Sequence, residues 1–221
     1  MNTKRYCYPK AIILQAVYFK LRFTLSYRDV EEIMKMRGIQ VDHSTIQRWV
    51  FKFTPMIESE MKKRKNRVGV SWRMDETYIK VKGIWCYLYR AVDKSGNTVD
   101  FLLTRRRQRM SAQSFLIKAI HNNCRPRVIN IDKSGSNTSA IRVYNKRSFS
   151  NIKIRQCKYL NNIVEQDHRF IKWRIQNSLG FKSFESAKRT LGGMEVVHML
   201  RKNQMLKPGI SMFKSFCKLA A

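Results

Sequence analysis

Acidic residues are scarce in this sequence. Its 221 residues include 15 Asp and Glu against 45 Lys and Arg, which gives a formal net charge of +30. The basic residues are spread along the whole chain, so most faces of the folded protein should be electropositive and attract polyanions. Nucleic acid is the first candidate partner, while charge alone leaves an anionic membrane or the ribosome as alternatives.

Paired cysteines and long apolar runs are also lacking. The five cysteines are odd in number and widely spaced, without a C-x-x-C pair or a Cys/His cluster. This pattern suggests neither a disulfide framework nor a zinc site, and a reducing cytosol fits best. The N-terminal apolar stretch is interrupted by Lys20 and Arg22 and lacks a small-residue cleavage site, which indicates neither a signal peptide nor a membrane span. We therefore expect a cytoplasmic protein that does not enter the membrane.

Three helical patterns follow one another between residues 10 and 53. The second begins at Ser26 with Asp29 three residues later, an arrangement typical of a capping box, and Gly38 stands at its end. Asp42 can cap the third, whose predicted inward face comprises Ile46, Trp49, Val50 and Phe53. Three short helices with a tight turn before the last are typical of a helix-turn-helix, and a plain three-helix bundle is the alternative.

The outward face of the third helix offers hydrogen-bond donors and cations that could meet base edges and phosphates. The candidate DNA contacts there are His43, Ser44, Gln47, Arg48 and Lys52. Pro55 should break or restart the helix, and the dense cationic run after it could track a phosphate backbone. Its candidates are Lys62, Lys63, Arg64 and Lys65. In both places a solvated polar face is the alternative.

From residue 68 the apolar period changes to two, which is typical of strands. Three strands joined by short turns are followed by a helix, a strand ending in "VINID", a helical or loop segment, a short strand and a last helix. This is the element order of the RNase H-like fold, an α/β architecture with a mixed sheet flanked by helices. We expect a helix-turn-helix domain at 1–54, a basic linker at 55–67, an RNase H-like domain at 68–180 and a helical tail at 181–221. Gly192 and Gly193 argue against a long rigid helix in that tail.

The few carboxylates of the second half are placed informatively. Asp75 lies inside the first strand, on the face opposite Trp72 and Met74 if that strand alternates regularly. Asp132 ends the fourth strand, whereas Asp93 and Asp100 flank a turn where Asp is common. In an RNase H-like topology these two strands are neighbours and the last helix crosses their ends, so Asp75, Asp132 and one acid of "NNIVEQDHRFIK" should converge. Crowded carboxylates suit Mg²⁺ or Mn²⁺, and two ions about 3.5–4 Å apart can hold a phosphodiester. A turn or helix-cap role for each acid is the alternative.

Four blocks of the chain resemble the bacterial insertion-sequence transposases of the DDE type, most closely insertion-sequence family six. They are "RGIQVDHSTIQRWV", "WRMDETYIKVKGIWCYLYRAVDKSGNTVDF", "VINIDKS" and "KYLNNIVEQDHRFIKWR". The resemblance implies that 68–180 is a catalytic domain with Asp75, Asp132 and Glu165 as catalytic metal ligands and Lys172 as a basic catalytic residue. The implied cofactor is Mg²⁺, with Mn²⁺ able to substitute, as two ions.

The resemblance also implies the reaction. A water would cleave the transposon end to free a 3′-hydroxyl, and this hydroxyl would attack target DNA. The helix-turn-helix would read the terminal inverted repeats, and a homodimer or higher oligomer on DNA would hold two ends together, with the tail as a candidate contact. The setting would be the bacterial nucleoid. Because "KSGSN" replaces the small residue, proline and aromatic common after the second aspartate, a catalytically decayed transposase is an alternative, as is a non-enzymatic DNA-binding regulator.

The last block carries two acids close together, and helix geometry separates them. Glu165, His168 and Lys172 are spaced i, i+3 and i+7 and share one face, whereas Asp167 lies about 200° around the helix from Glu165. We therefore interpret Glu165 as the ligand and Asp167 as a structural partner for a nearby Arg or Lys.

Overall fold

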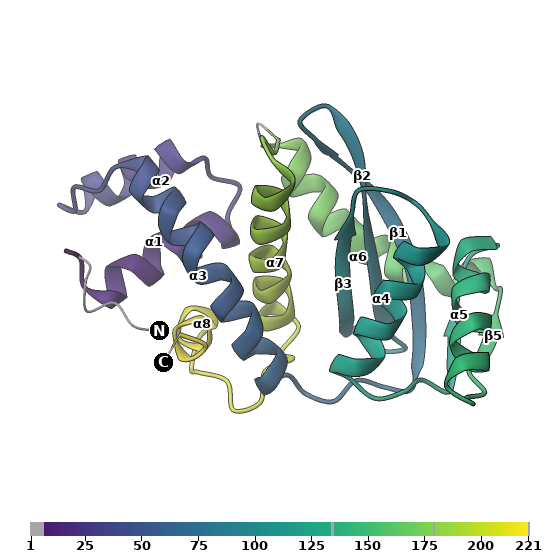
Figure 1. Ribbon diagram of the computed structural model, residues 1–221. Coiled ribbons are helices and arrows are strands. Elements are labelled where there is room, and N and C mark those ends of the chain that lie inside the picture. The colour runs from purple at the N-terminus through teal and green to yellow at the C-terminus, as the bar shows by residue number, and fades with distance from the viewer. Residues whose placement is uncertain (1–6, 134, 179, 221) are drawn as a thin grey trace. The chain divides into compact units, whose positions relative to one another are not determined.

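The computed structural model describes residues 7–133, 135–178 and 180–220 (Figure 1). Ser134, which belongs to "KSGSN", lies outside this set. Backbone contacts divide the chain into two compact units. One combines Met1–Asn66 with Arg174–Ala221, and the other is Arg67–Trp173. Over the described residues, no helix combines the length and the apolarity needed to span a bilayer.

The first unit is all helical. Its helices are α1 (Lys10–Arg22), α2 (Tyr27–Met36), α3 (His43–Arg64), α7 (Phe184–Arg201) and α8 (Met212–Lys218). Both predicted N-caps are confirmed: the Ser26 hydroxyl accepts from the Asp29 amide at 3.0 Å, and the Asp42 carboxylate accepts from the Ser44 amide at 2.8 Å. Gly38 ends α2 with a φ of +73°, where glycine is unstrained. The predicted inward face of α3 is buried.

The prediction that Pro55 interrupts the helix is wrong, and most of the expected linker, up to Arg64, continues α3. A proline inside a helix leaves the carbonyl four residues earlier without its amide donor. That carbonyl belongs to Phe51, and it accepts a hydrogen bond of 2.7 Å from the Arg189 guanidinium of α7. The same guanidinium lies 3.6 Å from the centroid of the Phe51 ring. Arg189 thus replaces the missing helical donor, which explains why the helix tolerates Pro55.

The contribution of Arg189 as the replacement donor to the Phe51 carbonyl can be measured. Arg189→Met should lower the free energy of unfolding by about 1 kcal/mol, the usual scale for a partly exposed charged hydrogen bond. In a Pro55→Ala background the helix regains its own amide donor, so the same change should cost less. Urea unfolding of the four proteins of this double-mutant cycle gives the coupling. Equal costs in both backgrounds would contradict the replacement.

The expected break at Gly192 and Gly193 is also absent, because α7 runs unbroken through both residues. A Cβ atom at Gly193 would lie 2.5 Å from a Leu21 methyl of α1 and 2.9 Å from the Thr54 methyl of α3. The glycine therefore permits a close approach of helices instead of ending one. Most of α7 is buried, and it packs on α3 and α1, so its apolar residues serve this unit's own core.

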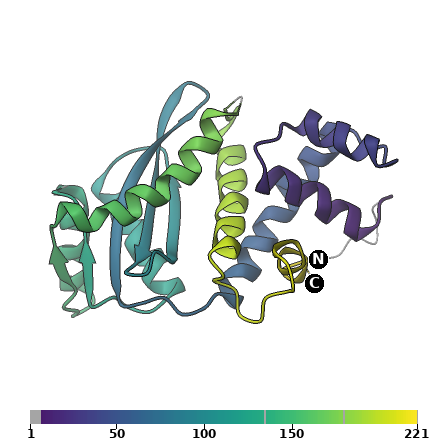
Figure 2. The same cartoon turned by 180° about the vertical axis from the view of Figure 1, so that it is seen from behind.

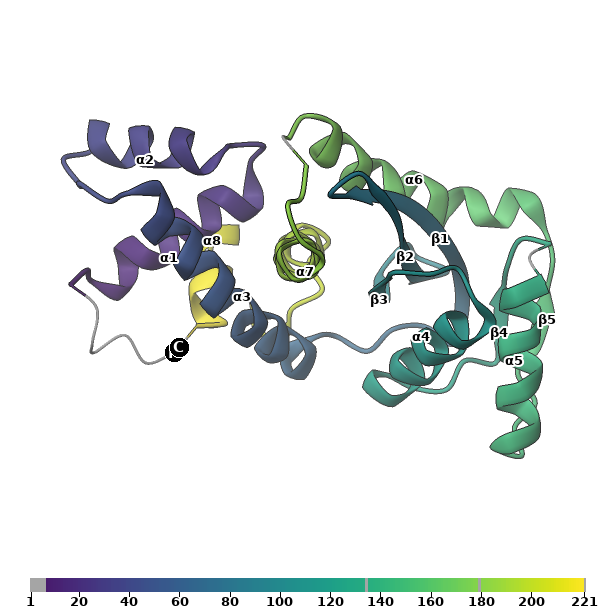
Figure 3. The same ribbon diagram turned by 45° about the horizontal axis from the view of Figure 1, so that its top comes forward.

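The second unit is a five-stranded sheet with helices on both faces. Its elements are β1 (Ser71–Val81), β2 (Ile84–Asp93), β3 (Thr98–Thr104), α4 (Arg109–Asn122), β4 (Val128–Asn130), α5 (Gly135–Arg147), β5 (Lys153–Arg155) and α6 (Lys158–Gln176), the last continuing into the first unit. The strand order is β3-β2-β1-β4-β5, antiparallel from β3 to β1 and parallel from β1 to β5. Figures 2 and 3 show α6 on one face of the sheet and α4 and α5 on the other. The predicted RNase H-like architecture is confirmed.

Strand alternation decides which β1 residues meet the core. Trp72 and Met74 are 1% exposed and pack in the cluster beneath α4 and α5, which turns Asp75 to the α6 face, as predicted. Asp93 accepts two amides of its turn, at Ser95 and Asn97, both at 2.9 Å.

The turn role expected for Asp100 is wrong. Asp100 is a buried residue of β3 that pairs with Lys118 of α4 at 3.0 Å. Ser111 does not cap α4, and its hydroxyl donates to the Arg106 carbonyl. Asn161 lies within α6, which begins three residues earlier.

Candidate active site and DNA-reading helix

Two of the proposed ligands are brought together by the parallel register of β1 and β4. Arg73 pairs with Asn130 in this register. Asp75 follows Arg73 by two residues, and Asp132 follows Asn130 by two residues. Continuing the register therefore places Asp75 and Asp132 side by side at the carboxyl end of β4. Functional groups commonly gather at this edge of a sheet.

Glu165 reaches the same place from α6. Burial raises the pKa of Asp75 to about 7, and the nearby charges of Glu76, Asp132 and Glu165 add to this rise. Like charges raise a carboxyl pKa only at short range, so all three predicted acids share one electrostatic neighbourhood. Glu165 itself is exposed and open to a ligand.

The histidine beside Asp75 does not compensate this charge. The His168 imidazole is 3% exposed, with Nδ1 3.7 Å from a carboxylate oxygen of Asp75, beyond hydrogen-bond range. Burial, together with the charges of Arg90 and Lys172, lowers the pKa of His168 to about 3, so the ring is neutral. Within the described part of the chain, its Nε2 has no hydrogen-bond partner. His168 therefore brings no positive charge to Asp75.

Two buried polar contacts fix α6 on either side of Glu165. The Asn130 amide, at the end of β4, donates to the Asn161 side chain at 2.6 Å. The Arg90 guanidinium of β2, which is fully buried, donates to Asp167 at 2.7 Å. Because these bonds lie one turn before Glu165 and two residues after it, they set the rotation of the helix and aim Glu165 at Asp75.

Asp167 is thus the structural acid and Arg90 its partner. Sequence reasoning anticipated an Arg or Lys for Asp167 but did not identify Arg90. The signal was present, because an arginine in the apolar strand "YLYRAVD" is costly unless an acid pairs with it.

A second missed group lies on the opposite face of β1. The buried carboxylate of Glu76 pairs with Arg107 of the β3–α4 loop and accepts from the Asn137 amide of α5 at 3.1 Å. Both partners lie in segments that border the Asp132 loop. Glu76 therefore anchors the surroundings of Asp132, while its neighbour Asp75 faces α6.

Known proteins match most of this chain in sequence. A family model described as "DDE domain" matches residues 69–204. The transposase for insertion sequence-like element IS431mec of Staphylococcus aureus (strain Mu50 / ATCC 700699) is 42% identical over 205 residues, which cover 91% of this chain and 90% of the relative. The chain belongs to this family of insertion-sequence DDE transposases.

Further matches accompany this assignment. The transposase for insertion sequence element IS257 in transposon Tn4003 of Staphylococcus aureus is 41% identical to the present transposase, with coverage of 91% and 90%. The trimeric form of the HTLV-2 integrase catalytic core, solved with magnesium, aligns with a TM-score of 0.48 at 15% identity, covering 72% of this chain and 100% of that one. The catalytic core of BIV integrase aligns at 0.46 and 18%, covering 68% and 95%.

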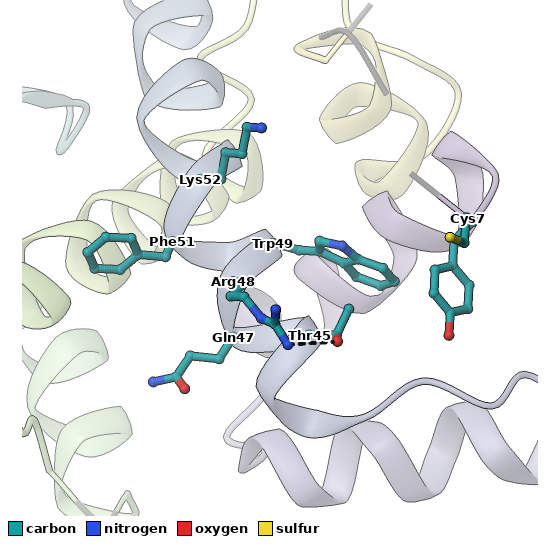
Figure 4. Close-up of a pocket in the computed structure, with 8 residues that line it drawn as sticks. Cys7, Thr45, Gln47, Arg48, Trp49, Phe51 and Lys52 are labelled. Carbon is teal, nitrogen blue, oxygen red and sulfur yellow. Dashed lines mark hydrogen bonds between the residues drawn. The ribbon is translucent and has the colours of Figure 1, made fainter. Parts of the chain in front are cut away.

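The transposase carries its predicted DNA contacts on the exposed side of α3. Gln47, Arg48 and Lys52 are exposed, and the Arg48 guanidinium donates to the Ser44 hydroxyl. It also folds back toward Thr45 (Figure 4). Beside them lies a cavity of about 660 Å³. Its lining comprises Cys7, Tyr8, Thr45, Gln47, Arg48, Trp49, Phe51 and Lys52.

Other predicted contacts of the transposase are engaged with acids or backbone. His43 Nδ1 lies 2.9 Å from Glu31 and 3.3 Å from Asp42. In the basic run, Lys62 forms an ion pair with Glu58, and Lys63 and Arg64 each form one with Glu60. Arg64 also donates a hydrogen bond to the Lys218 carbonyl. Lys65, the last predicted contact of this run, forms an isolated β-bridge with Met205.

Proposed function

We propose that this transposase binds the terminal inverted repeats of its own element through α3 and cuts and joins DNA at Asp75, Asp132 and Glu165. The observation that carries the proposal is the convergence of three acids around the half-buried Asp75, whose pKa is raised to about 7, in a chain of net charge +30. Such a group repels itself unless cations join it. A strong positive field elsewhere would bring DNA to it.

The donor set fits Mg²⁺, or Mn²⁺ in its place, because both prefer carboxylate oxygens. The three carboxylates are spread too widely to meet at one point. Among the described residues, the one group whose ligand atoms all lie within 4.8 Å of one another is Glu31, Asp42 and His43. A spread triad suits two ions about 3.5–4 Å apart, which would supply charge neutralisation at the scissile phosphate.

The protein's own share of the reaction is positioning. At the transposon end a water would attack phosphorus and release a 3′-hydroxyl, which would then attack a phosphodiester of the target and displace its 3′-oxygen. Lys172 lies two turns beyond Glu165 on α6 and is exposed, so its ammonium can bind a phosphate beside the acids. Holding the attacking oxygen and the phosphate in line removes much of the entropic barrier.

The reading of the end by α3 predicts different effects at two neighbouring residues. Gln47→Ala should weaken binding to the cognate end more than to a scrambled duplex, by roughly 1–3 kcal/mol if Gln47 contacts a base edge. Lys52→Ala should weaken both duplexes alike and reduce the slope of log Kd against log salt by about 1. Fluorescence anisotropy over a salt series checks both. A uniform loss for Gln47→Ala would remove it from base reading.

The assembly is proposed to be a homodimer or higher oligomer on DNA, because two element ends must be joined in one event. Sedimentation of the protein with end duplex should give complexes with two duplexes. A single protein chain per duplex at all concentrations would contradict it.

The chemistry is tested with a labelled end duplex and a supercoiled target plasmid. Full-length protein with Mg²⁺ or Mn²⁺ should produce a nicked end and joined plasmid, and EDTA should abolish both. Binding without any product under either metal would favour a transposase that has lost catalysis or acts only as a regulator.

A further inference from the structure

The outer half of the β1–β2 hairpin carries a cluster of exposed aromatic rings. Tyr78 and Trp85 are 49% and 55% exposed. Their ring centroids are 6.3 Å apart in an edge-to-face arrangement, and Tyr87 lies 5.3 Å from Tyr78. The Lys80 ammonium lies 5.6 Å from the Trp85 ring. Large rings are usually buried, so a contiguous exposed group of them marks a binding surface.

Strand alternation explains how this face stays open. Ile79, Val81 and Cys86, on the other face of the hairpin, are at most 4% exposed. The hairpin is therefore anchored by one face, while Tyr78 and Lys80 extend from the other. Tyr78 is three residues beyond Asp75 on the same strand, which is about 10 Å at the usual rise.

Arg107 joins the aromatic face to the active site. It pairs with Glu76, the residue that precedes Tyr78 on this face of β1. Burial lowers the pKa of Arg107, but the charge and hydrogen bond of Glu76, with smaller effects of Tyr78 and Asp132, together raise it above its ordinary value. Arg107 is thus close to both Tyr78 and Asp132. The residues Arg107, Tyr78, Lys80 and Trp85 form one row, termed here the hairpin strip, which starts near Asp132 on the face of β1 opposite Asp75.

We propose that the hairpin strip binds unpaired nucleotides of the DNA end next to the scissile phosphate, with Tyr78 and Trp85 stacking on bases and Arg107 and Lys80 contacting phosphates. In a duplex the base faces are covered by neighbouring pairs, so rings of this kind gain contact only where strands have separated. Alternating cations and aromatic rings is the pattern of single-strand binding surfaces. The inference rests on the proposed function, because it needs a DNA end at Asp75.

DNA fits the strip better than a second copy of the chain does. Two copies would each bring a net charge of +30, and two of the cations, Arg107 and Lys80, lie in the strip itself. Apposing like charges opposes association, whereas a phosphodiester strand is complementary to both the charge and the rings.

The test compares two end duplexes of the same sequence, one fully paired and one with three mismatched, unpaired nucleotides at the cut. Trp85→Ala should weaken binding of the unpaired end about 5- to 150-fold, the loss expected for one base–aromatic stack, and change the paired end by about twofold or less. Tyr78→Ala should act in the same direction. Trp85→Phe should retain most of the binding, and Ile84→Ala is the matched control because Ile84 is adjacent and 69% exposed. Fluorescence of 2-aminopurine in the unpaired segment reports stacking directly.

Three results would overturn the inference. Equal weakening of both duplexes by Trp85→Ala would show a general effect on DNA binding, and an unchanged 2-aminopurine signal would show that no ring stacks there. If Trp85→Ala abolished a protein dimer that exists without DNA, the strip would instead bind a second copy of the chain. The proposed function fails differently, because the parent protein would then yield no metal-dependent product, with or without the strip.

Discussion

Asp75→Asn should reduce the rate of strand transfer by about 10³-fold while leaving affinity for the element end unchanged or slightly higher. Replacing one ligand removes several kcal/mol of charge stabilisation from the transition state, and each 1.4 kcal/mol corresponds to about tenfold in rate. Binding should not weaken, because the change removes a negative charge near the DNA backbone. Asp132→Asn and Glu165→Gln should behave in the same way.

The measurement is single-turnover joining of a labelled end to plasmid, paired with an anisotropy titration of the same end. Glu185→Gln is the matched control, since Glu185 is an exposed acid of α7 that pairs with Arg189 on its own helix. It should leave the joining rate within about twofold, as expected for a surface substitution. Unchanged joining by Asp75→Asn would remove the triad from the mechanism.

Among the substitutions of an acid by its neutral amide, Asp167→Asn should be the most destabilising, lowering the free energy of unfolding by about 3–5 kcal/mol. The change removes from the fully buried Arg90 guanidinium the carboxylate 2.7 Å away, and breaking a buried ion pair by removing one partner carries a penalty of this size. Glu165→Gln, two residues earlier and exposed, should change stability by about 0.5 kcal/mol or less.

Urea unfolding of the two variants separates the neighbouring acids of α6. The double variant Arg90→Met/Asp167→Leu should recover part of the lost stability, because it removes both charges together. If Asp167→Asn were as stable as the parent but inactive in joining, Asp167 would be the ligand and the assignment of Glu165 would be wrong.

The sequence predicted the fold where local signals agreed. The capping box at Ser26, the alternation through Trp72 and Met74, and the turn at Asp93 each follow from one local rule, and the structure shows all three. The acid positions were predictable because acids are scarce and because the element order set which strands are neighbours.

What sequence reasoning missed depends on contacts between distant residues. Pro55 was expected to break α3, because nothing near it reveals that Arg189 supplies the missing donor. Gly193 was interpreted as a helix breaker for the same reason, since Leu21 approaches it from another helix. Tertiary partners decide these cases, and local propensity does not contain them.

The central claim is that Asp75, Asp132 and Glu165 form the divalent-metal centre, and titration of the full-length protein with Mn²⁺ in the presence of its end duplex tests it directly. Electron paramagnetic resonance of free Mn²⁺ should show saturable binding in the parent protein and in Glu31→Gln, which alters the other cluster of possible ligands. Asp75→Asn should abolish this binding. Binding that survives Asp75→Asn but is lost in Glu31→Gln would contradict the account.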